Sequence, residues 1–340
     1  MTEPERLPPE DTDPQAAGQD MTGQDAPDRE SAQEITQEIT GRPRIMTPAG
    51  FNPPATPPQE VGLRQKAVTF WKKNRALVRN PAFWGLVPRM LAFRLRTTIR
   101  PSPLSARPEV LFVATHHKAM TTYFHAVLRG LAFALNLPFE RVGNSDLPSK
   151  RAKLFLSMQG KQDLAALGPY RGAHVMRDPR DMIVSGYHYH KWTHEEWVHR
   201  LDDNGESYQD KLNRLDKHAG LFLEIDHFIF YYRDTLEAWD MANPAMLEVS
   251  YEALMGAGKR DLYRDIFAHL GFEGAELDLA VDLMKLFEAE SRTGKASGKV
   301  DQRSHVRSGK SRQWETELDP EHLAYIEQEL GPVLRKFGYD

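Results

Sequence analysis

The chain has 340 residues, of which 40% are hydrophobic and 27% are charged, a balance that fits a soluble globular protein and excludes a collagen-like or wholly disordered one. The net charge of −4 is too small to indicate nucleic acid as the main partner. The sequence contains no Cys, which excludes disulfides and favours the cytosol. It has no run of about 18 apolar residues, so no membrane span is predicted.

Residues 1–60 form an acidic segment with 12 Asp or Glu against 4 Lys or Arg. Their richness in Pro, Gly, Gln and Thr, and their lack of large apolar residues, predict disorder. The first ten residues have neither the cationic start nor the apolar run of a signal peptide, so we expect a cytoplasmic protein.

Residues 61–108 form a basic extension with 11 Lys or Arg and no acidic residue. Apolar positions predict two basic helices within 62–99, the second of which follows Pro81. Two interpretations stay open. The helices pack on the following domain and expose a solvated basic face, or they make peripheral contact with an anionic membrane or an anionic substrate.

Residues 109–340 alternate predicted strands and helices. Short apolar runs, typical of parallel strands buried on both faces, occur at 110–114, 153–157, 173–177 and 246–250. Helices are predicted at 121–135, from Pro179 onward, at 207–242 with a break near Arg233, and at 259–270, 275–288 and 319–337, where Asp319 and Pro320 form the helix start. The polar stretch 290–313 is predicted to be a loop. The alternation predicts an α/β domain with a parallel sheet covered on both faces.

The first motif is THHKAM, where the strand at 110–114 passes into the next helix. A helix N-terminus at the carboxyl edge of a parallel sheet attracts phosphate through its N–H groups and its dipole. Lys118 lies in the turn, and Thr121 and Thr122 add hydroxyls. The loop has no Gly, and Lys118 comes too early for a Walker A motif. Because no acidic Mg²⁺ ligand stands at a strand end, the sequence disfavours an ATPase or a kinase.

The second motif is MRDPRDMIVS. Arg177 leaves a strand at the same edge and offers a fork of donors to a dianionic phosphate. Asp178 is predicted to cap the next helix with Pro179 at its first position, and Ser185 follows two turns later. An isolated Arg-Asp-Pro is also explained by a capped helix with an exposed ion pair, but its placement after the first motif favours a second phosphate site.

The third motif is VRSGKSRQW at 306–314. A basic loop of this kind folds over a bound anion, whereas the alternative interpretation is a solvated run of charges. The run contains Arg307, Ser308 and Gly309.

In this order the three motifs resemble those of the sulfotransferases that use 3′-phosphoadenosine-5′-phosphosulfate (PAPS), a family of cytosolic-type and bacterial domains. The first motif is similar to the family's Pro-Lys-Ser-Gly-Thr-Thr-Trp and stands here as HKAMTTY. Met120 replaces Gly, so either it accepts a backbone shape that is easier for Gly or the loop differs slightly in shape from that of the family. The third motif has Ser308 where the family has Lys. A fourth, weaker similarity is Tyr251 after a strand, either near the nucleotide or closing the sheet edge.

The resemblance covers about 110–338 and implies a P-loop-like three-layer α/β fold with a central parallel sheet of about five strands flanked by helices. It implies in-line transfer of a sulfuryl group from PAPS to a hydroxyl or an amine of a small-molecule, lipid or glycan acceptor, without a metal. Lys118 would neutralise the leaving group, and Tyr123 would stack near the adenine. The implied nucleotide-binding residues are Lys118, Ala119, Met120, Thr121, Thr122, Tyr123, Arg177, Ser185, Tyr251, Arg307, Ser308 and Gly309.

The general base stays open at this point. Many family members place a His after the next strand, but the corresponding stretch 154–163 contains none. His117 is the candidate base. His116 beside it is an alternative, and either residue could instead line the loop; Lys161, Asp146 and Glu140 are weaker options. A binding scaffold of the same fold that lacks strong catalysis is therefore the alternative function.

The run His188, His190, His194 and His199 does not match the zinc-protease pattern, because Val198 stands where that pattern needs the second His. We expect this helix to border the acceptor.

Overall fold

The computed structural model describes residues 79–288 and 311–340. Its centre is a five-stranded parallel sheet with the strand order β2-β3-β1-β4-β5. The strands are β1 Val110–Ala114, β2 Phe139–Val142, β3 Leu154–Ser157, β4 Tyr170–Met176 and β5 Met246–Ser250. This sheet confirms the expected α/β fold with about five parallel strands.

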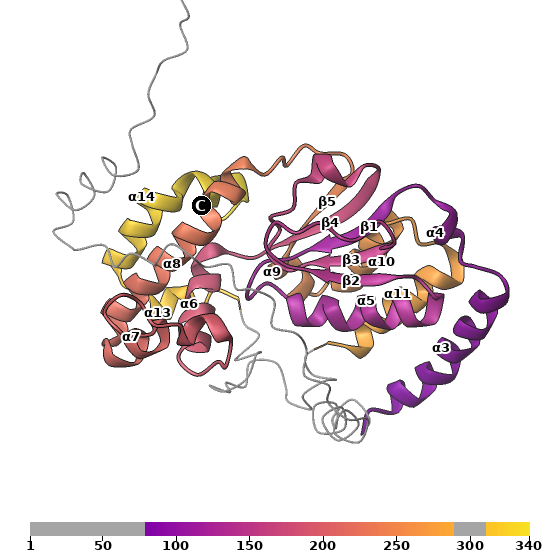
Figure 1. Cartoon of the computed structure of the whole chain (residues 1–340), viewed down its shortest axis with the longest axis horizontal. Coiled ribbons are helices and arrows are strands. Elements are labelled where there is room, and N and C mark those ends of the chain that lie inside the picture. The colour runs from indigo at the N-terminus through magenta and orange to yellow at the C-terminus, as the bar shows by residue number, and fades with distance from the viewer. Residues whose placement is uncertain (1–78, 289–310) are drawn as a thin grey trace, which may run out of the picture. The chain divides into compact units, whose positions relative to one another are not determined.

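Helices follow most of the strands. Their bounds are α3 Pro81–Ile99, α4 Pro103–Ala106, α5 Thr121–Leu135, η1 Leu164–Leu167, α6 Pro179–His190, η2 Glu196–His199, α7 Tyr208–Arg214, α8 Lys217–Ala238, α9 Tyr251–Met255, α10 Lys259–His269, α11 Gly274–Leu286, α13 Trp314–Glu317 and α14 Pro320–Lys336. In Figure 1, α5 and α11 lie along the sheet, whereas α6, α7, α8 and α14 gather beyond one end of the strands.

The two faces of the sheet are buried by different sets of side chains. Because side chains alternate along a strand, Leu111 and Val113 join the cluster that α5 and α11 complete. Phe112 and Ala114 face the opposite cluster, in which the rings of Phe112 and Phe155 stack with centroids 4.6 Å apart. A further apolar cluster joins α6, α7, α8 and α14. The loop after β1 therefore meets two separately packed regions.

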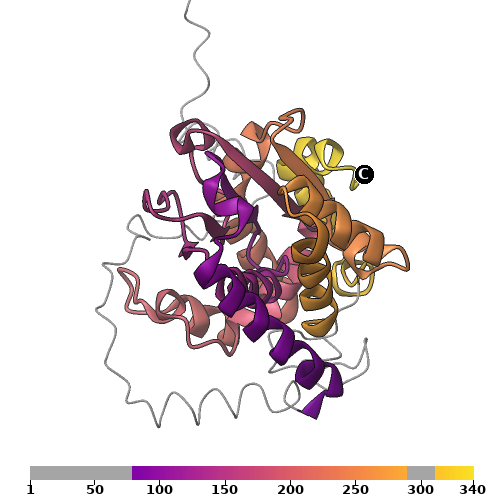
Figure 2. The same cartoon turned by 90° about the vertical axis from the view of Figure 1, so that its right-hand side faces the viewer.

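Helix α3 contacts α5 and α11. Its buried positions are Leu86, Phe93 and Thr97, and the Thr97 hydroxyl donates to the Ala134 carbonyl over 3.2 Å. In Figure 2, α3 runs across the near side of the described structure. Among the described helices, none combines the length and the apolar character needed to cross a bilayer.

Two details differ from the predictions. The edge strand β2 was not recognised, because its residues Glu140 and Arg141 are polar and it pairs with β3 alone. The predicted break near Arg233 is wrong. The chain breaks instead between α7 and α8, where Asp216 caps α8 by accepting the N–H of Ala219. The predicted start of the last helix, with Asp319 as N-cap and Pro320 at the first position, is confirmed.

The acidic segment 1–60 and most of the first predicted basic helix lie outside the described residues, as does nearly all of the predicted loop 290–313.

Candidate active site

The loop after β1 takes a shape that L-amino acids adopt rarely. Lys118 and Met120 have φ values of 68° and 64°, in the left-handed region that costs about 1–2 kcal/mol for a residue with a Cβ. Met120 therefore takes a backbone shape that is easier for Gly. The His116 carbonyl stabilises the loop by accepting the N–H of Ala119 over 3.0 Å and the hydroxyl of Thr121 over 2.9 Å. Met120 is the N-cap of α5 and offers no side-chain cap.

Arg177 follows β4 and lies against this loop. Its Nη1 donates to the Lys118 carbonyl over 3.1 Å, and its Nη2 donates to Asp181 over 3.2 Å. The guanidinium carbon lies 4.4 Å from the centroid of the Tyr251 ring. The structure therefore brings together Lys118, Arg177 and Tyr251, which come from three different strand ends.

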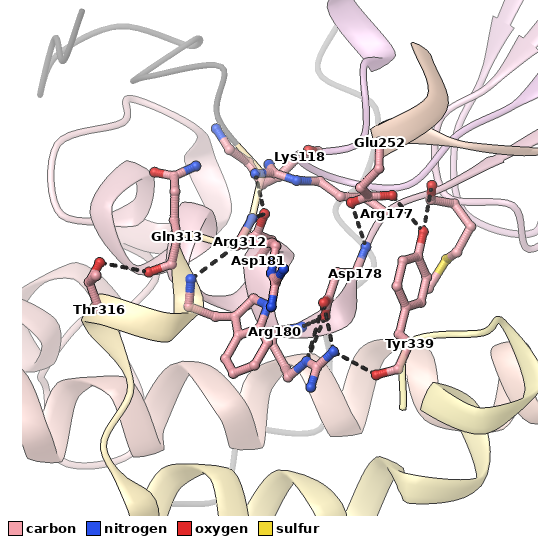
Figure 3. A network of polar contacts seen from close by, with 12 residues as sticks. Lys118, Arg177, Asp178, Arg180, Asp181, Glu252, Arg312, Gln313, Thr316 and Tyr339 are labelled. Atoms are coloured by element: carbon pink, nitrogen blue, oxygen red, sulfur yellow. Dashed lines mark hydrogen bonds and ion pairs between the residues drawn. The ribbon is translucent and has the colours of Figure 1, made fainter. Parts of the chain in front are cut away.

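Asp181 connects this site to the C-terminal part of the chain. Its carboxylate is fully buried and accepts the backbone N–H groups of Arg312 and Trp314 over 2.9 and 3.1 Å. Figure 3 draws Lys118, Arg177, Asp181 and Arg312 as one connected group. The third motif ends at this junction, whereas Arg307, Ser308 and Gly309 lie outside the described residues.

The start of α6 follows the prediction. The Asp178 side chain accepts the N–H of Arg180, and Pro179 occupies the first turn. Arg180 also forms an ion pair with Asp178 and lies 4.0 Å above the Trp314 ring. Ser185, further along α6, is half-buried.

The other loop residues are placed as follows. Ala119 is fully buried, and Thr122 is exposed at the start of α5. Tyr123 is 8% exposed and donates its hydroxyl to the Met284 carbonyl over 2.7 Å. Tyr123 therefore lies between α5 and the end of α11.

His117 contacts the C-terminal end of α6. Its Nε2 lies 3.2 Å from Nε2 of His190, and the two rings stack. Nδ1 of His190 lies 2.9 Å from the Glu224 carboxylate, which also accepts the Tyr208 hydroxyl over 2.8 Å. These residues form a continuous polar chain from the loop into α8.

His116, by contrast, is fully buried. Its Nε2 lies 2.7 Å from Nε2 of His174, and Nδ1 of His174 lies 2.6 Å from Glu248. Glu248 also accepts the indole N–H of Trp239 over 2.8 Å. Two neighbouring residues of one loop thus begin two similar His–His–Glu chains, and only His117 is partly exposed.

Aromatic side chains surround Lys118 and His117. The Lys118 ammonium lies 3.8 Å from the centroid of the Tyr189 ring. Tyr189 and Trp197 both donate to Glu195, over 2.7 and 2.9 Å. Burial opposes ionisation of Glu195, but His117 and these hydrogen bonds lower its pKa. Glu195 thus binds the polar groups of Tyr189 and Trp197, and the apolar faces of the rings lie beside Lys118 and His117.

Burial also sets the charge of the His117 chain. It lowers the pKa of His117 well below its usual range, an effect that His190 and Lys118 reinforce. It lowers the pKa of His190 to about 3, with Lys118 contributing. Both imidazoles are therefore neutral at physiological pH.

Sequence reasoning missed Glu224 and Asp181 as site residues and noted His190 only within a run of histidines. Glu224 lies in the middle of α8, and no local pattern relates it to α6. Asp181 was part of the second motif, and it forms an ion pair with Arg177, which precedes the start of α6. The weaker base candidates Glu140 and Asp146 lie away from this chain, where Glu140 accepts the Ser149 backbone N–H over 2.8 Å.

One group of His and Asp side chains within the described residues has ligand atoms close enough for a metal, namely His218, Asp319 and His322. Their contacts are those of a helix cap. Asp319 accepts the N–H of His322, and Nε2 of His322 lies 2.9 Å from the His218 carbonyl. This group lies apart from the Lys118 loop, at the start of α14.

Among solved structures, the mouse sulfotransferase SULT7A1 complexed with PAP is 13% identical; the match covers 68% of this chain and 86% of that one, with a TM-score of 0.42. A retinol dehydratase in complex with androsterone and inactive cofactor PAP is 16% identical; that match covers 72% and 86%, with a TM-score of 0.44. No curated protein sequence matches. The family model described as "Sulfotransferase domain" matches residues 114–338. This chain belongs to the sulfotransferase family.

Proposed function

We propose that this protein transfers a sulfuryl group from PAPS to a hydroxyl or an amine of an acceptor. The observation that carries the proposal is the hydrogen bond from Arg177 to the Lys118 carbonyl. It joins the two motifs that resemble the 5′-phosphosulfate and 3′-phosphate sites, which are far apart in the sequence. Adenosine 3′,5′-bisphosphate carries phosphates at both ends of one ribose, so a PAPS site requires this juxtaposition.

The residues proposed to bind PAPS fall into two groups, one for each end of the nucleotide. Lys118, the hydroxyls of Thr121 and Thr122, and the N–H groups at the start of α5 bind the 5′-phosphosulfate. Arg177 and Ser185 bind the 3′-phosphate, assisted by the third motif. Tyr251 lies under the Arg177 guanidinium and positions it through a cation–π contact.

In the reaction the acceptor oxygen attacks sulfur in line. The bond between sulfur and the bridging oxygen of the 5′-phosphate breaks, and its electron pair stays on adenosine 3′,5′-bisphosphate. The acceptor proton moves to His117, and the sulfuryl group remains on the acceptor oxygen. Negative charge grows on the bridging oxygen, where the Lys118 ammonium stabilises it.

The first experiment tests donor recognition. Calorimetric titration with adenosine 3′,5′-bisphosphate, beside ATP with Mg²⁺, is expected to give binding of the former only. ATP turnover would instead support a nucleotide kinase. Absence of binding of the bisphosphate would contradict the proposal.

The second measurement follows transfer from PAPS to 4-nitrophenol and to a panel of alcohols and amines. Lys118→Ala is expected to lower kcat on the order of 10²–10³-fold, the usual cost of losing a group that stabilises a developing charge. Lys150→Ala, at an exposed position, is the matched control. Binding of the bisphosphate without transfer to any acceptor would support the alternative, a scaffold of the same fold.

We further propose a cytoplasmic protein with an acidic segment over 1–60, a basic helical extension over 61–108 and the sulfotransferase domain over 109–340. The extension is proposed to contact an anionic membrane surface. Four large apolar side chains on α3 are more than half exposed, namely Trp84, Leu91, Leu95 and Ile99. Their spacing of seven, four and four residues puts them on one helix face. Arg residues accompany them at 94, 96 and 100, whereas Arg89 pairs with Asp282. This charge is complementary to anionic lipid.

A further inference from the structure

The chain from His117 to Glu224 determines which ring nitrogen of His117 carries a proton. His117 and His190 approach each other through their Nε2 atoms, and His190 faces Glu224 through Nδ1. Within the described residues, the hydrogen bonds of His117 involve its backbone N–H and Nε2. Nδ1 of the half-buried His117 therefore remains for the acceptor.

The direction of each hydrogen bond follows from the carboxylate. An ionised Glu224 only accepts, so Nδ1 of His190 must carry the proton between them. A neutral imidazole has one N–H, so Nε2 of His190 has a lone pair. The proton in the contact between His190 and His117 must then belong to Nε2 of His117. This leaves the His117 lone pair on Nδ1.

We propose that Glu224, acting through His190, is a positioning residue that fixes His117 with its proton on Nε2 and its basic lone pair on Nδ1. The inference rests on the sulfotransfer proposed above, because it assigns a base for that reaction. Neither Glu224 nor His190 touches the reacting atoms. Their part is to select the tautomer, as the third group of a catalytic triad does for its His.

The backbone of α6 holds Glu224 in place. A Cβ on Gly186 would lie 2.3 Å from Oε1 of Glu224, so the carboxylate packs directly against the helix. Tyr208 fixes the other oxygen from α7. The carboxylate is thus restrained on two sides while it contacts His190.

Protonation of Glu224 reverses the direction of the hydrogen bonds that run from Glu224 through His190 to His117. A neutral carboxyl group donates to Nδ1 of His190, whose Nε2–H then donates to Nε2 of His117. The His117 proton moves to Nδ1, where it blocks the base. Burial raises the pKa of Glu224 to about 7, although His227, Tyr208 and Lys118 oppose the shift. The groups that face Glu224 are His190 of α6, Tyr208 of α7, His227 and Tyr232 of α8, and Lys118 of the loop.

The direct test is the tautomer itself, measured in the full chain by ¹⁵N NMR of labelled imidazoles. At pH 8.5, His117 is expected to show an unprotonated Nδ1 and a protonated Nε2. Acidification towards pH 6 is expected to exchange the two signals, and Glu224→Gln is expected to abolish this exchange because an amide does not titrate. A protonated Nδ1 at pH 8.5, or the same exchange in Glu224→Gln, would overturn the proposal.

Glu248→Gln is the matched control, because it removes the carboxylate of the His116 chain and is expected to leave the His117 signals unchanged. Turnover gives a second readout. With PAPS and 4-nitrophenol, Glu224→Leu is expected to lower kcat about 100-fold or more, within the usual range for a general base, with KM for PAPS within about threefold. Glu224→Gln is expected to lose the acid limb of the kcat profile. Absence of turnover in the unmodified protein would contradict the proposed function, whereas the NMR result stands by itself.

Discussion

Arg177 makes three kinds of contact from one planar group. The guanidinium donates to a backbone carbonyl and to the Asp181 carboxylate, and it lies over the Tyr251 ring. A Lys ammonium is a compact charge that cannot form a fork and stack at the same time. The geometry at this residue therefore depends on Arg and not only on a positive charge.

Arg177→Lys is expected to weaken the binding of adenosine 3′,5′-bisphosphate about tenfold or more, because a charge-assisted hydrogen bond contributes about 1.5–3 kcal/mol. Calorimetric titration measures the affinity. Arg89→Lys, at an ion pair on α3, is the control and should bind as the unmodified protein does. Equal affinity in the two variants would remove Arg177 from the nucleotide site.

At the scale of elements, α3 has two apolar faces. One face packs on α5 and α11 through Leu86 and Phe93. The other exposes Leu95 by 68% and Ile99 by 75%. Exposed large side chains gathered on one face mark an interaction surface, whereas single ones are ordinary. The Arg residues on the same helix favour lipid phosphates over an apolar protein partner.

The double variant Leu91→Ser with Leu95→Ser is expected to lower the binding to phosphatidylglycerol vesicles at least tenfold, because it removes about half of the apolar face. Co-sedimentation measures the bound fraction, and phosphatidylcholine vesicles should bind weakly. Leu201→Ser, at a site 67% exposed outside α3, is the matched control. If the double variant bound as tightly as this control, α3 would not be the contact.

At the scale of the whole molecule, several imidazoles of the described residues are buried. Burial is the largest cause that lowers the pKa of His116, His117, His190 and His227, the last to about 4. Their folded-state pKa lies below the unfolded value, so their stability contribution is complete above about 6.5 and is lost as the pH falls. Glu224 acts in the opposite direction. Its pKa is raised from 4.5 to about 7, so its contribution is lost as the pH rises through that window.

Among these five groups, the four imidazoles outnumber Glu224, so their combined contribution to stability is lost on acidification. Each unmatched proton changes the free energy of unfolding by about 1.4 kcal/mol per pH unit. We expect the free energy of unfolding to decrease between pH 7 and pH 5, measured by urea denaturation at both values. His227→Gln should flatten this dependence by about one proton. Equal stability at the two pH values would mean that these imidazoles are accessible to protons in the folded state.

Local signals explain what could be predicted. The strand–loop–helix pattern located Lys118. The replacement of Gly by Met120 left open whether this residue takes a backbone shape easier for Gly, and the structure places it in the left-handed region. The cap at Asp178 and the start of α14 at Asp319 follow from side chains that bond their own helix. These features depend on residues within one turn of each other.

The missed features depend on packing at long range. The polar strand β2 is stabilised by its pairing with β3. The residues of β2 alone do not predict this pairing. The contact between His190 and Glu224 exists because α6 packs on α8 at Gly186. A Gly within a helix predicts reduced helix stability but not the element that approaches it. The general base was left open for this reason.

The bonds from Arg312 and Trp314 to Asp181 span 131 and 133 residues of sequence. A ribosome adds about 5–20 residues per second. Synthesis of the segment from Asp181 to these two partners therefore takes roughly 7–26 s. Throughout that interval the emerging chain holds a charge that the finished protein buries. Translation speed between α6 and α13 thus sets how long the chain depends on solvent or a chaperone to shield this carboxylate.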